Sequence, residues 1–358
     1  MSAARRARGA AAIAALLGLA MAGSGCDRTP SLVPAGADSI RANPDTLAIL
    51  ARAAASRWDA GDDEQGSALS ARVVLEALRL RPNAPWPERS RALLDSLGVS
   101  AEVSGDDRLV VVNMFSRASG GDASYPYLFW RDGGPHMQPL ETQDLRLVAV
   151  TARGFDSGAE AGDSARAAVL WGRRVSSGQQ PLLMVWRHAK GGRWDLAQTL
   201  GADSLGGVGT GEFSGADTSL ALTTRTYRPT PFFDECPTCP HVFHERRFAW
   251  RPAGFVRTDD QIVPSPYVAF TSFVAALVAD DRDLASRFAT DPSLVDFARR
   301  YEWNQSARGR WRVAPGTADG TTSMVFLRGA SEAFRVAFEP RDGDWVVAGF
   351  EPTTAPIE

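Results

Sequence analysis

The sequence predicts a mixed α+β protein, with a helical hairpin or bundle at residues 43–98, a mainly antiparallel β domain at residues 106–260 and a small α+β domain at residues 265–352. Apolar residues recur at helical spacing before residue 98. Short runs rich in Val, Leu, Phe, Trp and Thr follow, separated by clusters of Gly, Asp and Ser. Pro264-Ser265-Pro266 then interrupts both patterns and marks the start of the last domain.

The first 25 residues have the anatomy of a secretory signal peptide. Arg5, Arg6 and Arg8 make a basic start, an apolar run covers residues 10–22, and small residues follow. The run is shorter than the roughly 20 apolar residues with which a helix spans a bilayer. The sequence therefore predicts an exported protein rather than one that crosses the membrane several times.

Gly23-Ser24-Gly25-Cys26 resembles the lipobox of bacterial lipoproteins, in which the cysteine is lipidated and becomes the first residue of the mature chain. Gly23 departs from the pattern, because an aliphatic residue usually stands at that position. The resemblance implies that Cys26 attaches a lipid, that this lipid anchors the protein in a membrane, and that the body faces the periplasm or the cell exterior. Residues 26–42 are polar and form a tether. The alternative is cleavage by the ordinary signal peptidase, which leaves Cys26 as a free thiol.

The slight excess of acidic residues argues against two classes of binding partner. The chain carries 39 Lys and Arg residues against 42 Asp and Glu residues, a formal net charge of -3. Removal of the arginines of the signal makes the mature chain more negative. Nucleic acid and an anionic membrane surface are therefore not expected partners, and we expect an envelope protein or a wall component instead.

Three helices are expected between residues 43 and 98. Asn43-Pro44-Asp45 combines a capping residue with proline at the first helical position. Apolar residues then recur at helical spacing as far as Trp58, over residues 67–80, and again between Pro87 and Gly98. We expect these helices to pack on the β domain that follows rather than to begin a repeat array.

Eight apolar runs predict the strands of the central domain. They cover residues 109–115, 125–130, 145–150, 167–175, 182–187, 194–200, 220–227 and 242–250. No helices alternate with them, so a sandwich or a partial propeller-like sheet is predicted instead of a parallel α/β fold. Residues 206–211 are rich in glycine but lack the lysine and the glycine spacing of phosphate-binding loops. This stretch is expected to be a flexible loop between strands.

Five of the ten tryptophans fall in the central domain. Exposed on one sheet face, they would form a stacking platform for sugars or peptides, whereas buried tryptophans would belong to the core. Each lies within or at the end of an apolar run, so burial is the expectation for Trp130, Trp171, Trp186, Trp194 and Trp250.

The last domain is predicted to contain helices and then four strands. The helices cover residues 267–279 and 284–301, and the strands cover residues 311–314, 323–327, 333–338 and 345–350. This order, with Trp345-Val346-Val347 in the last strand, resembles the small NTF2-like domains appended to bacterial lipoproteins, whose helices wrap a curved antiparallel sheet. The resemblance implies a pocket of the kind that some members use for catalysis. It implies no catalytic residue here, because no motif matches position by position.

Cys236 and Cys239, with His241 and His244 nearby, form the densest cluster of reactive residue types. With Cys26 lipidated, the two cysteines are an even pair in an oxidising compartment, which favours a disulfide. Zinc held by these four residues is one alternative, although the two histidines would point to opposite faces of a strand. A redox-active pair is the other, although no helix is predicted to begin beside the thiols.

The sequence contains no nucleophile elbow, no S-x-x-K and no H-E-x-x-H motif. We therefore predict no catalytic residue, no cofactor and no metal site. The expected function is that of a non-enzymatic binding or scaffold module in the cell envelope. The alternative is an exported thiol–disulfide or metal-dependent enzyme centred on Cys236 and Cys239.

Overall fold

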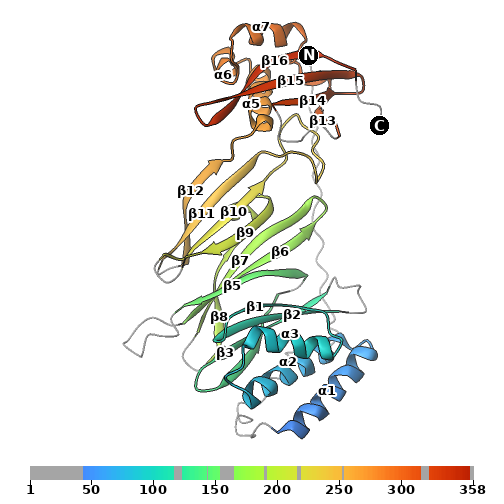
Figure 1. Ribbon diagram of the computed structural model, residues 1–358, viewed down its shortest axis with the longest axis vertical. Coiled ribbons are helices and arrows are strands. Elements are labelled where there is room, and N and C mark those ends of the chain that lie inside the picture. The colour runs from blue at the N-terminus through green and yellow to red at the C-terminus, as the bar shows by residue number, and fades with distance from the viewer. Residues whose placement is uncertain are drawn as a thin grey trace, which may run out of the picture. The chain divides into compact units, whose positions relative to one another are not determined.

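The computed structural model describes residues 43–116, 123–142, 144–153, 165–188, 192–215, 219–251, 254–315 and 322–354. The predicted signal peptide, Cys26 and the tether lie outside these residues. No helix within the described ranges is both long enough and apolar enough to cross a membrane. The order of helices and strands is that of a mixed α+β protein with a β-rich centre, as predicted (Figure 1).

Three helices open the described chain, namely α1 (Pro44–Asp59), α2 (Asp63–Leu80) and α3 (Trp86–Ser96). Asn43 caps α1, because its side chain accepts a hydrogen bond from the backbone N–H of Asp45 at 3.0 Å. Val74 and Leu78 of α2 are fully buried in a cluster with side chains of the first sheet. The helices therefore cover one face of that sheet, as the sequence predicts (Figure 1).

Four antiparallel sheets follow, each made of four strands that pair in chain order. The first contains β1 (Ala101–Gly105), β2 (Leu109–Phe115), β3 (Ser124–Arg131) and β4 (Pro135–Pro139). The second contains β5 (Leu145–Arg153), β6 (Arg166–Val175), β7 (Gly178–His188) and β8 (Trp194–Leu200). The third contains β9 (Val208–Ser214), β10 (Ala221–Tyr227), β11 (Phe243–Arg251) and β12 (Gly254–Ile262). The fourth contains β13 (Trp311–Val313), β14 (Ser323–Arg328), β15 (Glu332–Arg341) and β16 (Asp344–Pro352).

The first three sheets pack face to face. On β2, Val110 and Val112 pack against the helices, whereas Val111 packs against the second sheet. On β6, Trp171 packs toward the first sheet and Leu170 toward the third. Because successive side chains of a strand point to opposite faces, a strand covered on both faces is apolar at every position. The five tryptophans of this region are buried, as predicted: Trp130, Trp171, Trp186, Trp194 and Trp250.

The sequence misses four strands, namely β1, β4, β9 and β12. The flexible loop expected at residues 206–211 is wrong, because β9 begins at Val208. A Cβ added at Gly209, whose φ is +150°, would lie 2.1 Å from the carbonyl oxygen of Arg225 on β10. Glycine is therefore required there by the close approach of two paired strands, not by a loop.

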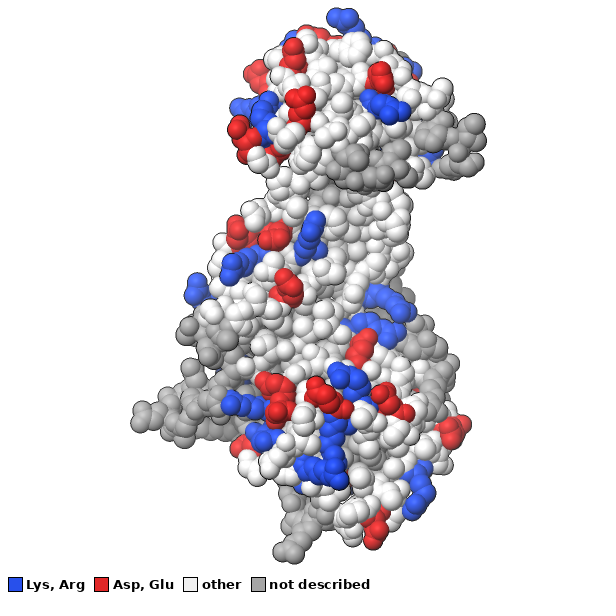
Figure 2. Space-filling view, viewed as in Figure 1, with Lys and Arg blue, Asp and Glu red and all other residues white. Residues whose placement is uncertain are grey.

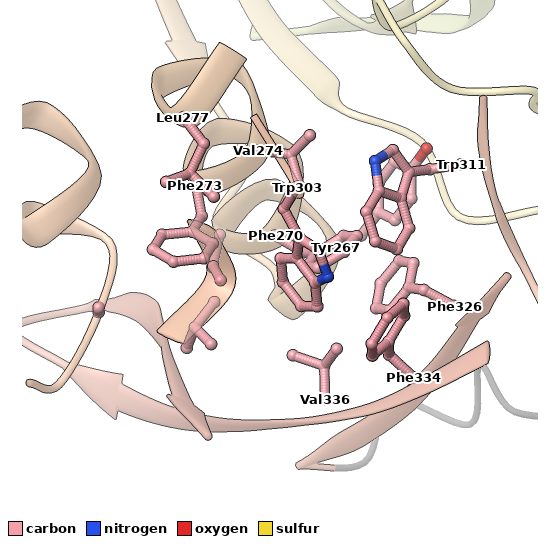
Figure 3. Close-up of a cluster of buried hydrophobic side chains, with 14 of the residues drawn as sticks. Tyr267, Phe270, Phe273, Val274, Leu277, Trp303, Trp311, Phe326, Phe334 and Val336 are labelled. Atoms are coloured by element: carbon pink, nitrogen blue, oxygen red, sulfur yellow. The ribbon is translucent and has the colours of Figure 1, made fainter. Parts of the chain in front are cut away.

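The C-terminal domain places α5 (Pro266–Val278), α6 (Arg282–Arg287) and α7 (Ser293–Arg300) with the fourth sheet. The helical stretch predicted at residues 284–301 is interrupted before Ser293, where Pro292 precedes α7. Aromatic side chains fill the space between α5 and the sheet (Figure 3). The rings of Phe270 and Phe326 are stacked with centroids 3.8 Å apart, and Trp303 is 1% exposed beside them.

A long connection between β10 and β11, residues 228–242, inserts into the C-terminal domain. We call this segment the connecting loop. Phe233 within it is 1% exposed and packs on the rings of Tyr267 and Phe270, with centroids 5.7 and 5.9 Å away. The backbone N–H of Trp311 donates to the carbonyl of Phe232 at 2.8 Å. The backbone carbonyl of Trp311 accepts in turn from the backbone N–H of Asp234 at 2.7 Å. The loop therefore forms part of the core of the last domain.

Candidate functional site

The connecting loop contains a disulfide between Cys236 and Cys239. Their Cα atoms are 5.0 Å apart, and the backbone N–H of Cys239 donates to the carbonyl of Cys236 at 3.0 Å. Across the described ranges, no group of three or more His, Cys, Asp and Glu side chains is arranged to hold a metal ion. His241 and His244 do not meet at one centre, since each binds a different carboxylate.

Glu235, the residue before the disulfide, is the most buried carboxylate of this region, with 5% of its side chain exposed. Its Oε1 accepts a hydrogen bond from the hydroxyl of Tyr267 at 2.7 Å. Its Oε2 accepts from the backbone N–H of Thr230 and pairs with Nδ1 of His241, both at 3.3 Å. His241 also stacks on the ring of Tyr227, with centroids 3.5 Å apart. Glu235 therefore ties both ends of the connecting loop to the first turn of α5.

The surroundings of Glu235 shift its pKa and those of two tyrosines. Burial by itself would raise the pKa of Glu235, but hydrogen bonds from His241, Thr230 and Tyr267 outweigh it and hold the pKa below its usual value. Burial and the nearby Glu235 carboxylate raise the pKa of both Tyr267 and Tyr227. Glu235 is therefore an ionised acceptor at neutral pH, and Tyr267 is a neutral donor.

A smaller cavity of about 340 Å³ lies beside this cluster. Cys239, His241 and Tyr267 are among the residues that line it, together with Phe243 of β11. The Nε2 atom of His241 is buried and has no hydrogen-bond partner within the described part of the chain. The sequence analysis singles out Cys239 and His241 of this cavity but not Tyr267, nor Glu235 beside it.

A larger cavity of about 520 Å³ lies between the third sheet, the start of the connecting loop and α5. Thr226 of β10 pairs with His244 of β11, so their side chains share one face of the sheet, and Arg246 lies two residues further along the same face. Ala275 of α5 lines the cavity from the opposite side, and Arg228, Arg257 and Asp203 complete its charged lining. Sheet residues thus form its floor.

One carboxylate beside this floor contacts two arginines and one histidine. Asp260 of β12 accepts from Nε of Arg246 at 2.9 Å and from Nη1 of Arg257 at 3.1 Å, and it pairs with Nδ1 of His244 at 3.1 Å. Burial would raise the pKa of Asp260, but the hydrogen bonds and charges of His244 and Arg246 hold it below its usual value. Asp260 is therefore ionised and orders the floor of the cavity.

Charge elsewhere on the surface is mixed. Figure 2 shows basic and acidic side chains interspersed over the face in view, without a broad area of one sign. This distribution agrees with the near balance of basic and acidic residues in the sequence. At the larger cavity, by contrast, the one carboxylate of Asp260 contacts two arginines and one histidine, a local arrangement that the composition does not reveal.

Replacing both bridged cysteines, Cys236→Ser with Cys239→Ser, is expected to lower the melting temperature by only a few degrees. The disulfide closes a very short loop, and in the chain-entropy model such loops contribute about 2 kcal/mol or less. Because the two cysteines are bridged to each other, a chelator is expected to leave the melting temperature unchanged. A structural zinc would contribute on the order of 10 kcal/mol, and its removal would lower the melting temperature strongly. Thermal unfolding with and without chelator tests both statements. A metal that copurifies one to one with the protein would instead support the zinc interpretation.

No family model, curated protein or solved structure matches the chain.

Proposed function

We propose that this protein is an exported cell-envelope lipoprotein, anchored through Cys26, that binds a partner in the larger cavity without transforming it chemically. The anchor rests on the signal peptide and on the resemblance of residues 23–26 to a lipobox. The observation that carries the binding function is the ordered floor of the cavity. Arg246 is held by Asp260 and also donates from Nη1 to the hydroxyl of Thr226 at 3.0 Å. A site whose side chains are fixed before binding loses less entropy when a ligand arrives.

Two features of the fold support a binding role. Three stacked meanders of four strands favour a partial propeller-like arrangement over a two-sheet sandwich, and their packed layers give the third sheet, which forms the cavity floor, a rigid support. The C-terminal domain, with helices against a four-stranded sheet, supports the NTF2-like resemblance. Its interior is filled by rings such as Phe270, Trp303 and Phe334, so we place the ligand outside that core (Figure 3).

The tether limits where the partner lies. A tether the length of residues 26–42 reaches roughly a few tens of ångströms at most. The partner is therefore an envelope protein or wall component close to the membrane that holds the lipid.

A thiol–disulfide enzyme is the second candidate function. It is favoured by one observation, since Cys239 and His241 both line the smaller cavity. Against it, the two sulfurs are already paired and His241 is engaged by Glu235. Reduction of a disulfide substrate that stops in the Cys236→Ser variant would favour the enzyme over the binding protein.

Filling the larger cavity is expected to abolish capture of the envelope partner. Ala275 is exposed on α5 and lines the cavity, so Ala275→Trp occupies that space at a helix-propensity cost below about 1 kcal/mol. Full-length protein, purified in detergent and immobilised, is incubated with envelope extract, and the retained components are identified by mass spectrometry.

The matched control is Ala92→Trp, the same substitution at an exposed position of α3 away from the cavity. It should capture the same components as the wild type. Equal capture by the Ala275→Trp and Ala92→Trp variants would refute the larger cavity as the binding site. Palmitate that enters the protein only when Cys26 is present supports the anchor.

A further inference from the structure

The charges of the larger cavity leave a positive excess at its floor. Two arginines and one histidine converge on the single carboxylate of Asp260. Arg228 adds a third arginine, and its nearest carboxylate, Asp203, is fully exposed at 4.0 Å. An exposed pair at that distance contributes little, because solvent screens it. Three arginines, Arg228, Arg246 and Arg257, thus face two carboxylates, Asp203 and Asp260, and the cavity carries a net positive charge.

The arginines also retain unused donors. Arg246 uses Nε and Nη1, and its Nη2 has no hydrogen-bond partner in the described ranges. Arg257 binds Asp260 through Nη1 and is 55% exposed, so its other nitrogens point to solvent or to a ligand. A guanidinium has five donors in a planar fork that matches the oxygens of a carboxylate or phosphate. The unused donors fit an oxyanion.

The backbone makes room for this arrangement. Gly206, with φ of +96°, lies against Arg246 and Thr226. A Cβ at that position would come within 2.1 Å of Nη1 of Arg246 and 2.0 Å of Oγ1 of Thr226. Any other residue at position 206 would displace the guanidinium from the floor, so the position of Arg246 is built into the fold.

We infer that the ligand of the larger cavity carries an oxyanion, a carboxylate or phosphate group, that binds to Arg228, Arg246 and Arg257. This inference rests on the proposed binding function and specifies the chemistry of its ligand. Charge-assisted hydrogen bonds of arginine to such groups are about twice as strong as neutral ones. A bound oxyanion neutralises the positive charge of the arginines that the carboxylates of the cavity leave unbalanced.

Inorganic phosphate and succinate are the two probes, and sodium chloride at equal ionic strength is the reference. Full-length protein in neutral detergent is expected to melt at a higher temperature with one of these anions than with chloride, because a ligand that binds only the folded state stabilises it. Greater stabilisation by phosphate points to a phosphate-bearing ligand, and greater stabilisation by succinate points to a carboxylate. Calorimetric titration gives the affinities.

Arg228→Gln and Arg257→Gln are each expected to weaken anion binding about tenfold, the loss of one charge-assisted hydrogen bond. Both side chains are more than half exposed, so the variants should fold, which their melting temperature in chloride verifies. Arg247→Gln is the matched control, because Arg247 is exposed on the same strand as Arg246 and points to the opposite face. It should keep wild-type affinity.

Two results would overturn the inference: no stabilisation beyond chloride, or an equal loss in the Arg247→Gln variant. The proposed function is tested separately by Ala275→Trp. If that variant loses the envelope partner while neither anion binds, the cavity remains the site and only the oxyanion is wrong. If it keeps the partner, the proposed function itself fails.

Discussion

Truncating Trp303 to alanine is expected to lower the free energy of unfolding by about 3–5 kcal/mol, the range for a large aromatic side chain removed from a packed core. Trp303 is 1% exposed, and its ring lies 4.1 Å from that of Phe350 and 5.0 Å from that of Trp311, measured between centroids. Phe350 lies on β16 and Trp311 on β13, so two separate strands would line the resulting cavity. Urea unfolding followed by circular dichroism measures the loss.

Leu284→Ala provides the comparison within the same domain. Leu284 lies on α6 and is 38% exposed, so its truncation removes little buried surface. Surface substitutions of this kind change stability by about 0.5 kcal/mol or less. If both variants lost the same stability, the aromatic cluster would not be the core of the C-terminal domain.

Replacing Glu235 by alanine is expected to cost about 3 kcal/mol or more. The change leaves the hydroxyl of Tyr267, the Nδ1 of His241 and the backbone N–H of Thr230 without their acceptor. Each buried donor left unsatisfied costs about 1–3 kcal/mol. Glu235→Gln keeps an acceptor oxygen of the same shape, so we expect a smaller loss at neutral pH. An unchanged stability of the Glu235→Ala variant would mean that the hydrogen bonds of Glu235 contribute nothing.

The pH dependence of stability separates the charge of Glu235 from its shape. The pKa of this carboxyl is lower in the folded protein than in the unfolded chain, so the folded state binds fewer protons. Its stabilisation is fully present above the unfolded pKa, about 4.3, and is lost as the pH falls through the folded pKa. The difference in unfolding free energy between wild type and the Glu235→Gln variant should therefore shrink between about pH 5 and pH 3. A constant difference over that range would contradict an ionised Glu235.

The strongest strand signals in the sequence come from strands that other layers cover. The run at residues 109–115 is apolar throughout because helices lie on one face of β2 and the second sheet on the other. β12 lies at the edge of its sheet and is exposed from Val256 onward, so its sequence is polar and gives no strand signal. Burial, rather than hydrogen bonding, is what the composition of a strand records.

The contacts within the candidate sites are also hard to predict from the sequence, because most of their partners lie far apart in the chain. The disulfide of Cys236 and Cys239 is predicted from the sequence, because its partners are close in the chain and form an even pair in a protein expected to be exported. The contact of Glu235 with Tyr267 spans 32 residues, and that of His244 with Asp260 spans 16. The second contact also depends on the register of β11 and β12, which shifts at a bulge between Arg247 and Phe248. No local pattern encodes such a register.

The insertion of the connecting loop determines how the chain can be divided. Pro264-Ser265-Pro266 looks in the sequence like a junction at which two independent domains could be separated. Yet Phe233, which lies well upstream of that junction, belongs to the core of the last domain. A fragment that begins at Pro264 would lack this side chain and both backbone hydrogen bonds to Trp311. The C-terminal domain is therefore not a transplantable unit, and recombination that moves it between proteins would have to carry residues from inside the preceding sheet.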